Sequence, residues 1–289
     1  MITTSTRPTV TITLFFLLLL LTSAHSIRLY YNDSQTHTLT LPSYPSHNIF
    51  LSSNTTLQLT NGATITAPPT VNDGESTVRI DDATFTGVNG TITGGATFGG
   101  VGITISSSRD GITHGTASFA NGMYVYGGEA SRSSTTQGGD AIQVLQSGSM
   151  AIFTGGEIVA GKGCSREICG VNNNNGNAVK VIMGTVVIMG GRFDGDFYNL
   201  QGLIRLFGCV ELKDNGGRIG GVLSDGSEID VVYVGEEEGL EVEFDESVCP
   251  VNKDVVEVVD DPEASAGAHQ SRRWSSLLVM ATVMLVAMS

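Results

Sequence analysis

Three similar phrases fill the middle of this chain, and their pattern decides the fold. They are AIQVLQSGSMAIFTGGEI (Ala141–Ile158), AVKVIMGTVVIMGGRF (Ala178–Phe193) and LIRLFGCVELKDNGGRI (Leu203–Ile219). Each has a short run of alternating apolar residues, a break at or near a glycine, a second run, and then a Gly-Gly pair with one more apolar residue. Units that repeat every 20–50 residues or so, and that cannot bury an apolar face alone, stack on one another. The phrases therefore predict a stacked architecture of short strands.

Gly-Gly pairs mark the ends of these units. They begin at positions 94, 127, 155, 190 and 216, at intervals of 33, 28, 35 and 26 residues. Glycine is typical of corners where the backbone turns sharply or φ is positive. No amphipathic helical stretch separates the pairs, so the sequence predicts one all-β domain, a parallel β-helix (β-solenoid), over residues 27–249. The alternative is an open sandwich with a surface-receptor role, which antiparallel pairing of neighbouring strands would mark.

Alternation within the phrases predicts which side chains face inward. An inner apolar column is expected from Ile142 and Val144, Val179 and Val181, and Ile204 and Leu206. If the three phrases stack in register, Gln143, Lys180 and Arg205 lie between these residues and face outward from equivalent positions. They would form a polar line on one face of the solenoid.

The composition suits many short strands and excludes one class of partner. The chain has 289 residues, among them 37 Gly, and only 15% of its residues are charged. Of its 29 acidic and 15 basic residues, 14 acidic and one basic lie within residues 228–263. No basic patch is large enough to bind nucleic acid, and the acidic end would repel phosphates.

The first 26 residues are typical of a secretory signal peptide. Arg7 precedes the apolar run LFFLLLLL (14–21), and small residues follow it up to Ser26. The run is too short for a membrane span, which needs about 20 residues. In a secreted protein, three tripeptides become acceptors for N-linked glycans, at Asn32, Asn54 and Asn89.

Secretion also makes the four cysteines candidates for disulfides. Proximity favours Cys164 with Cys169, which would close one loop. Cys209 would then pair with Cys249 and tie the late repeats to the acidic end. Four cysteines allow three pairings, and the spacing alone does not choose between them. A zinc site is less favoured, because the spacing is loose and no histidine follows.

The C-terminal end has the order of a lipid-attachment signal. Residues 250–265 form an acidic linker, which we interpret as a solvated spacer. Residues 266–289 follow with a polar spacer and the apolar tail LLVMATVMLVAM (277–288). This order resembles a glycosylphosphatidylinositol signal with attachment near Ser265, and it places the protein at the extracellular face of the plasma membrane. A short membrane tail and a buried strand are the alternatives.

The phrases GDAIQVLQSG (139–148), GNAVKVIMG (176–184) and GLIRLFG (202–208) resemble the pectin-lyase-like class of right-handed parallel β-helices. The resemblance concerns architecture, over roughly residues 27–249. It implies a fold that occurs in polysaccharide lyases, glycoside hydrolases, adhesins and carbohydrate epimerases. A fold of this breadth does not fix a function.

The resemblance implies two kinds of catalytic site, and the chain matches neither well. Hydrolases of the class use clustered aspartates with a histidine, for which Asp81, Asp82 and His114 are the candidates here. Lyases of the class use calcium and a basic residue, for which Asp194 and Asp196 would be metal ligands and Arg205 the base. Turn and loop roles explain these residues equally well. We assign no catalytic residue and no cofactor, and we favour a protein that is not an enzyme.

The outward side chains instead favour contact with sugars. Tyr124 and Tyr126 lie one coil before Gln143, and aromatic faces and planar hydrogen-bonding groups suit sugar rings. With Lys180 and Arg205, these residues predict a strip that contacts extracellular polysaccharide or cell-wall glycans, including acidic ones. A solvated sheet face is the structural alternative. The sequence thus predicts a secreted, membrane-anchored solenoid with a structural, adhesive or carbohydrate-contacting role. A polysaccharide lyase or hydrolase is the rival function.

Overall fold

The computed structural model describes residues 27–249, apart from 41–42, 46, 69–74, 97–98, 108–112, 132–136, 170–173 and 215–216. The predicted signal peptide, acidic linker and lipid-attachment signal lie outside the described residues. Within them the protein is all-β, with 21 strands, the short helix α2 (Arg166–Cys169) and the 3-10 helix η1 (Glu237–Gly239). No helix in this part of the chain is long and apolar enough to cross a membrane.

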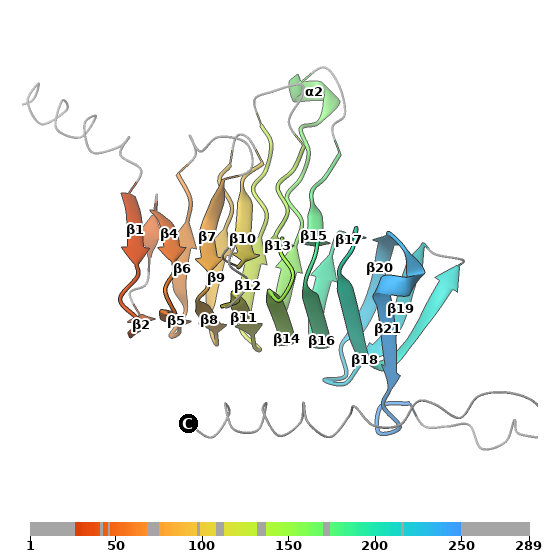
Figure 1. Ribbon diagram of the computed structural model, residues 1–289. Coiled ribbons are helices and arrows are strands. Elements are labelled where there is room, and N and C mark those ends of the chain that lie inside the picture. Colours follow the sequence, from red (N-terminus) through yellow and green to blue (C-terminus); the bar gives the residue numbers. More distant parts are fainter. Residues whose placement is uncertain are drawn as a thin grey trace, which may run out of the picture. The chain divides into compact units, whose positions relative to one another are not determined.

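The strands form three rows, each made of one strand or half-strand per coil (Figure 1). Row A contains β1 (Ile27–Tyr31), β4 (His47–Leu51), β7 (Ser76–Asp81), β10 (Val101–Ser106), β13 (Ile142–Val144), β15 (Asn177–Val181), β17 (Asp196–Asn199) and β20 (Glu228–Val234). Row B contains β2 (Thr36–Leu39), β5 (Thr56–Leu59), β8 (Thr84–Gly87), β11 (Thr116–Phe119), the first halves of β14 (Met150–Val159) and β16 (Thr185–Asp194), β18 (Leu203–Asp214) and β21 (Leu240–Phe244). Row C contains β3 (Tyr44–Pro45), β6 (Ala63–Thr66), β9 (Gly90–Thr93), β12 (Met123–Tyr126) and the second halves of β14 and β16.

Each strand pairs in parallel with the strand one coil before it and the strand one coil after it. In row A, for example, β10 pairs with both β7 and β13, and β15 pairs with β13 and β17. This connectivity is consistent with the predicted β-solenoid. Among the described strands, antiparallel pairing is confined to β18–β19 and β19–β20, so the mark of the sandwich alternative is missing from the coils.

The core is a set of columns that run from coil to coil. Row A contributes in-register, fully buried residues such as Val78, Ile103, Ile142 and Val179. Row B contributes the stacked rings of Phe85, Phe119 and Phe153, whose centroids lie 5.9 and 4.8 Å apart. This phenylalanine file continues through Phe193 of row C to Phe197 of row A. Such contacts stabilise each coil only against its neighbours.

The Gly-Gly corners explain how one strand can serve two rows. In β14 and β16 the second glycine of each pair, Gly156 and Gly191, has a φ of 98° and 111°. A side chain at such a φ would be strained, whereas glycine is not. The β14 and β16 pairing also shifts register at this point, between Phe153 and Glu157. The strand therefore turns from row B into row C without ending.

The predicted alignment of the third phrase is wrong, although its inward residues are buried. Ile204 and Leu206 are fully buried, but they pair with Val186 and Ile188 in row B, not with Val179 and Val181 in row A. The row A strand of that coil is β17, whose short sequence Asp-Phe-Tyr-Asn carries one apolar residue that points inward, Phe197. The sequence pattern missed β17 because it lacks the Ala-apolar start of β13 and β15.

The last coils change from parallel to antiparallel pairing. After Gly208, β18 continues beside β19 (Arg218–Leu223), and β19 in turn pairs with β20. Both predicted disulfides are confirmed: Cys164 bonds to Cys169 around α2, and Cys209 of β18 bonds to Cys249. Disulfides of this kind are typical of oxidising compartments outside the cytosol.

An ion-pair cluster joins the three antiparallel strands. Asp230 of β20 accepts two hydrogen bonds from Arg218 of β19, at 2.8 and 2.7 Å, and one from Lys213 of β18, at 3.4 Å. The hydrogen bonds from Arg218, and then those from Lys213, lower the pKa of Asp230 from 3.8 to about 2. Because the folded pKa is depressed, the stabilisation is present above pH 3.8 and is lost as the pH falls towards 2.

We expect Asp230→Asn to remove this acid-sensitive contribution. The urea midpoint of the wild type should exceed that of the variant at pH 5. The gap should narrow between pH 4 and pH 2, since the Asp230 carboxyl takes up a proton in the unfolded state before it does so in the folded state. Urea unfolding followed by circular dichroism at each pH measures the gap. Glu228→Gln, which removes an acid from the same strand, is the control. A constant gap over this range would contradict the assignment.

Candidate functional site

The outward side of row A carries a column of polar side chains in register, of which one, Thr104, is only 4% exposed. In the strands β7, β10, β13, β15 and β17, side chains of one register column alternate with the buried core residues. This column, the row A strip, consists of Arg79, Thr104, Gln143, Lys180 and Tyr198. Figure 1 shows the five strands side by side in this order. The coil-to-coil pairing thus places residues more than 100 positions apart in one line.

A nearly buried carboxylate anchors the middle of the strip. Asp140, just before β13, is only 8% exposed. One of its oxygens accepts hydrogen bonds from the backbone N–H and the side-chain amide of Asn177, at 2.8 and 2.7 Å. The other accepts from the Gln143 amide at 2.7 Å and lies 3.8 Å from the Lys180 ammonium. A buried carboxylate needs such partners, so Asp140 fixes the positions of the Asn177 and Gln143 amides that donate to it.

Lys180 links this cluster to an aromatic ring. Its ammonium lies 5.6 Å from the centroid of the Tyr198 ring on the next coil, within the range of a cation–π contact. The Lys180 side chain is 34% exposed and Tyr198 is half-buried, so both groups remain partly open to solvent. The site therefore offers an ammonium, an amide and a ring face on three successive strands.

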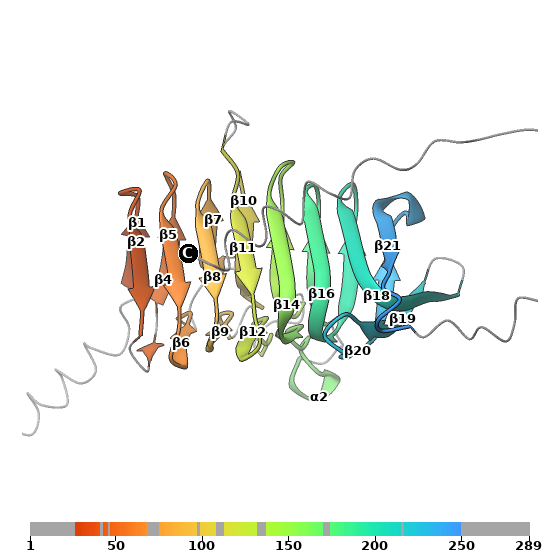
Figure 2. The ribbon, with the colours of Figure 1, turned by 90° about the horizontal axis from the view of Figure 1, so that it is seen from below.

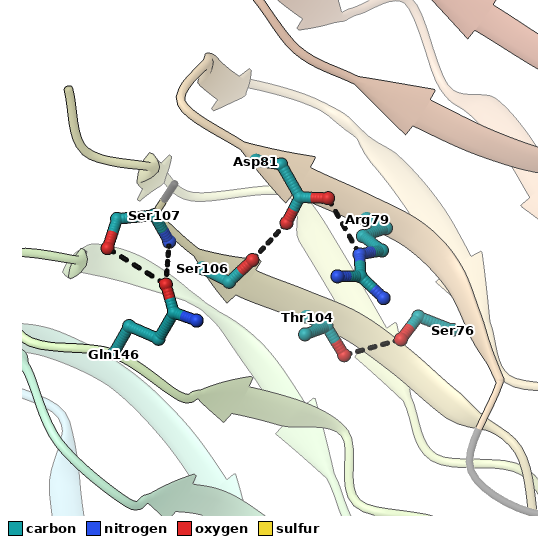
Figure 3. Close-up of polar contacts among 7 residues, drawn as sticks. All are labelled: Ser76, Arg79, Asp81, Thr104, Ser106, Ser107 and Gln146. Atoms are coloured by element: carbon teal, nitrogen blue, oxygen red, sulfur yellow. Dashed lines mark hydrogen bonds and ion pairs between the residues drawn. The ribbon is translucent and has the colours of Figure 1, made fainter. Parts of the chain in front are cut away.

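A second cluster lies on β7 and β10 (Figure 3). The guanidinium Nε of Arg79 donates to one oxygen of Asp81 at 2.8 Å, and the hydroxyl of Ser106 donates to the other oxygen. The hydroxyls of Ser76, at the start of β7, and Thr104, within β10, share a hydrogen bond. This cluster extends the strip by one cation and one acid, while the residues that carry its hydroxyls are buried.

The end of β10 is tied to the loop after β13. Gln146 accepts hydrogen bonds from the backbone N–H and the hydroxyl of Ser107, both at 3.0 Å (Figure 3). Ser107 also forms an isolated antiparallel bridge with His114. The polar groups around the strip thus hold one another in place before any ligand arrives.

The two cations of the strip each have an acidic neighbour. Arg79 pairs with Asp81 and Lys180 with Asp140. The strip is therefore balanced in charge, and it offers donors and acceptors in mixed order. Such a surface is suited to polyhydroxyl ligands and has no net attraction for a polyanion.

The structure brings together only part of the predicted polar line. Gln143 and Lys180 are direct register partners, as predicted. Arg205 was wrongly placed beside them: it lies in row B, in register with Val187, and its guanidinium pairs with Glu241 at 2.9 Å. The misplacement follows from the missed strand β17, whose Tyr198 takes the position expected for Arg205.

The two predicted tyrosines lie on another side of the coil. Tyr124 and Tyr126 are in β12 of row C, in register with Thr91 and Thr93 on one side and with Glu157 and Val159 on the other. Partial burial, followed by the charges of Glu157 and Tyr124, raises the pKa of Tyr126. They belong to a different row from Gln143 and Lys180.

The residues considered for a lyase or a hydrolase site do not come together as a catalytic site within the described residues. Asp194 ends β16 in row C, Asp196 begins β17 in row A, and both are exposed. No group of three or more His, Cys, Asp or Glu side chains gathers as a metal site within the described residues. Of the hydrolase candidates, Asp81 is bound by Arg79 and Ser106, and Asp82 sits in a corner with a φ of 53°.

The asparagines predicted to carry glycans are all exposed. Asn32, Asn54 and Asn89 lie in corners or loops between strands, outside the core. Attachment at these positions stays a prediction. Ser265, the predicted lipid-attachment residue, lies outside the described part of the chain.

Sequence reasoning missed the residue on which the site is centred. Asp140 and Asn177 occupy equivalent places in Gly-Asp-Ala-Ile-Gln and Gly-Asn-Ala-Val-Lys, immediately before the apolar start of β13 and β15. A polar residue recurring at that place was a usable signal. Arg79 and Thr104 carried no comparable signal, because outward positions of strands are usually polar.

The chain matches no protein-family model, no curated protein and no solved structure. What the protein does must therefore be inferred from the side chains of the row A strip and from their surroundings.

We expect Asp140→Ala to destabilise the protein by about 1–3 kcal/mol, because it leaves the amides of Asn177 and Gln143 without their acceptor. Urea unfolding followed by circular dichroism measures the change. Asp196→Ala is the matched control, since it removes an exposed acid in register with Asn177 and should cost less than about 0.5 kcal/mol. An equal loss of stability in the two variants would show that Asp140 does not hold the cluster together.

Proposed function

We propose that this protein is an extracellular β-solenoid that contacts polysaccharide through the row A strip and does not transform it. The observation that carries the proposal is the fixed cluster of Asp140, Gln143 and Lys180 beside the ring of Tyr198. We also propose that the solenoid is of the right-handed, pectin-lyase-like form. The proposed strip no longer includes Tyr124, Tyr126 and Arg205, because these residues lie on other rows.

The chemistry of the strip suits sugars. A pyranose presents hydroxyls that both donate and accept, and an apolar ring face between them. Carboxylate, amide, ammonium and hydroxyl groups in mixed order can satisfy the hydroxyls, and an aromatic ring such as Tyr198 can cover the apolar face. Because the groups already bond to one another, binding orders few side chains and so costs little conformational entropy.

The shape of the strip favours a polymer. Thr104 of β10 is buried, so the exposed groups of the strip lie on β7, β13, β15 and β17. From β7 to β17, at about 4.8 Å per strand, the strip spans about 20 Å. This length exceeds that of one sugar unit and follows the direction in which the coils stack. An extended glycan, such as one of a cell wall, fits this arrangement better than a small metabolite.

The proposed location follows from the two ends of the chain. The signal peptide at residues 1–26 would direct the chain into the secretory pathway, and the lipid attached near Ser265 would hold the solenoid on the outer face of the plasma membrane. The two disulfides are compatible with that compartment. We expect a phosphatidylinositol-specific phospholipase to release the protein from membranes of intact cells. Retention in the membrane fraction after treatment would reject the lipid anchor.

Affinity electrophoresis in gels with an acidic glycan (polygalacturonate or alginate) or a neutral one (laminarin or xylan) tests the strip. We expect at least one glycan to retard the wild type. Tyr198→Ala, which removes one ring contact, should weaken the dissociation constant by roughly fivefold, or about 1 kcal/mol. Gln143→Ala should act in the same direction, because it removes a half-buried amide of the strip and one of the hydrogen bonds that hold Asp140.

Two control variants separate the strip from the rest of the surface. Tyr124→Ala removes a tyrosine of row C, and Arg205→Ala removes a cation of row B that has its own acidic partner. Both should migrate as the wild type does. Equal losses in all four variants, or no retardation by any glycan, would reject the proposal. Release of reducing ends or unsaturated products during incubation would favour the rival, a polysaccharide-active enzyme.

A further inference from the structure

Row B carries a second ordered surface, of different chemistry. Its first four strands, β2, β5, β8 and β11, lie side by side (Figure 2) and pair in register. Each contributes two outward side chains, two residues apart. Together these eight form the row B hydroxyl array: Thr36 and Thr38, Thr56 and Gln58, Thr84 and Thr86, and Thr116 and Ser118.

The hydroxyls of this array are available to an external partner. Within the described residues, Ser118 is the one member whose hydroxyl forms a hydrogen bond, to the carbonyl of Phe85 at 3.4 Å. The eight side chains are exposed or half-buried. They alternate with the buried residues Leu57, Phe85 and Ala117, so the backbone beneath them is fixed by the core.

The array also lacks the groups that select other ligands. None of its eight side chains is charged or aromatic. A polyanion would find no cation here, and a sugar would find no ring for its apolar face. Six of the eight are threonines, which combine one hydroxyl and one methyl on a side chain with few χ1 rotamers. The array is therefore a neutral lattice made mainly of hydroxyls and methyls, with one amide at Gln58.

The spacing of this lattice matches that of hydrogen-bonded water. Equivalent hydroxyls on successive coils repeat at the strand spacing of about 4.7–4.9 Å. Two O–H···O bonds of about 2.75 Å that meet at the tetrahedral angle of a water oxygen place the two outer oxygens about 4.5 Å apart. One tetrahedral water can thus bridge each pair of neighbouring threonines in the column of Thr36, Thr56, Thr84 and Thr116. The second column runs parallel to it and is mixed, with Thr38, Gln58, Thr86 and Ser118.

We propose that the row B hydroxyl array binds the surface of ice. Ice is the solid in which every water oxygen has this tetrahedral geometry and second-neighbour spacing. Waters held along the threonine column would already occupy lattice-like positions, and the threonine methyls would exclude competing orientations. The array ends after β11, where Met150 and Ile152 of β14 take over the outward positions. The proposed contact therefore spans four coils.

The test grows ice slowly through a solution of the fluorescently labelled protein and measures the fraction taken into the ice. We expect enrichment in ice relative to a globular reference protein, together with a gap between melting and freezing temperatures in an osmometer. Thr84→Lys places a long charged side chain inside the array and should abolish both effects. Thr56→Lys, on the neighbouring strand, serves if the first variant does not fold as the wild type does by circular dichroism.

Thr185→Lys is the matched control. Thr185 is an outward threonine of row B as well, but its neighbours on the adjacent strands are Met150 and Leu203. This variant should enter ice as the wild type does. Gln143→Ala and Tyr198→Ala should also be unaffected, so failure of the glycan strip and failure of the ice surface are separate results. Exclusion of the wild type from ice, or equal losses in Thr84→Lys and Thr185→Lys, would overturn the proposal. Retention on a neutral glycan without enrichment in ice would do the same.

Discussion

The in-register parallel pairing between successive coils is the constraint on which the rest of the structure depends. Because side chains alternate along a strand, a slip of one residue would move every core residue to the surface. The buried columns through Val78, Ile103, Ile142 and Val179 hold row A in register, and the phenylalanine file holds row B. The same register aligns the outward side chains. Both candidate surfaces are therefore consequences of core packing, since no outward contact is needed to line them up.

The two surfaces differ because their rows expose different side chains on the same scaffold. In row A the outward column mixes charges, amides, hydroxyls and a ring, and buried Asp140 fixes their positions. In row B one outward column is all threonine, the other holds two threonines, a glutamine and a serine, and the backbone aligns both. A mixed, internally bonded cluster suits a ligand whose groups vary along its length. A neutral array that repeats threonine from coil to coil suits a ligand that repeats at the coil spacing.

The sequence predicted the fold better than it predicted the site. Alternation around Ile142 and Val179 was enough to place β13 and β15 side by side, because both strands start with the same Ala-apolar pattern. It failed for Arg205, because every row alternates in the same way and the pattern does not say which row a strand joins. Asp140 could have been found from its match with Asn177. The hydroxyl array could not have been found in this way, because threonine is common in strands. Only the register between strands shows that the threonines align.

The end of the solenoid shows how the repeat is terminated. A parallel stack leaves an open edge, which in principle accepts another strand. Here β18 extends beyond Gly208 and forms an antiparallel sheet with β19 and β20. Ion pairs from Asp230 of β20 to Arg218 of β19 and Lys213 of β18 link the three strands. The Cys209–Cys249 bond then ties the segment after β21 to β18. Because β20 also pairs in parallel with β17, this antiparallel sheet continues directly from the row A strand that carries Tyr198.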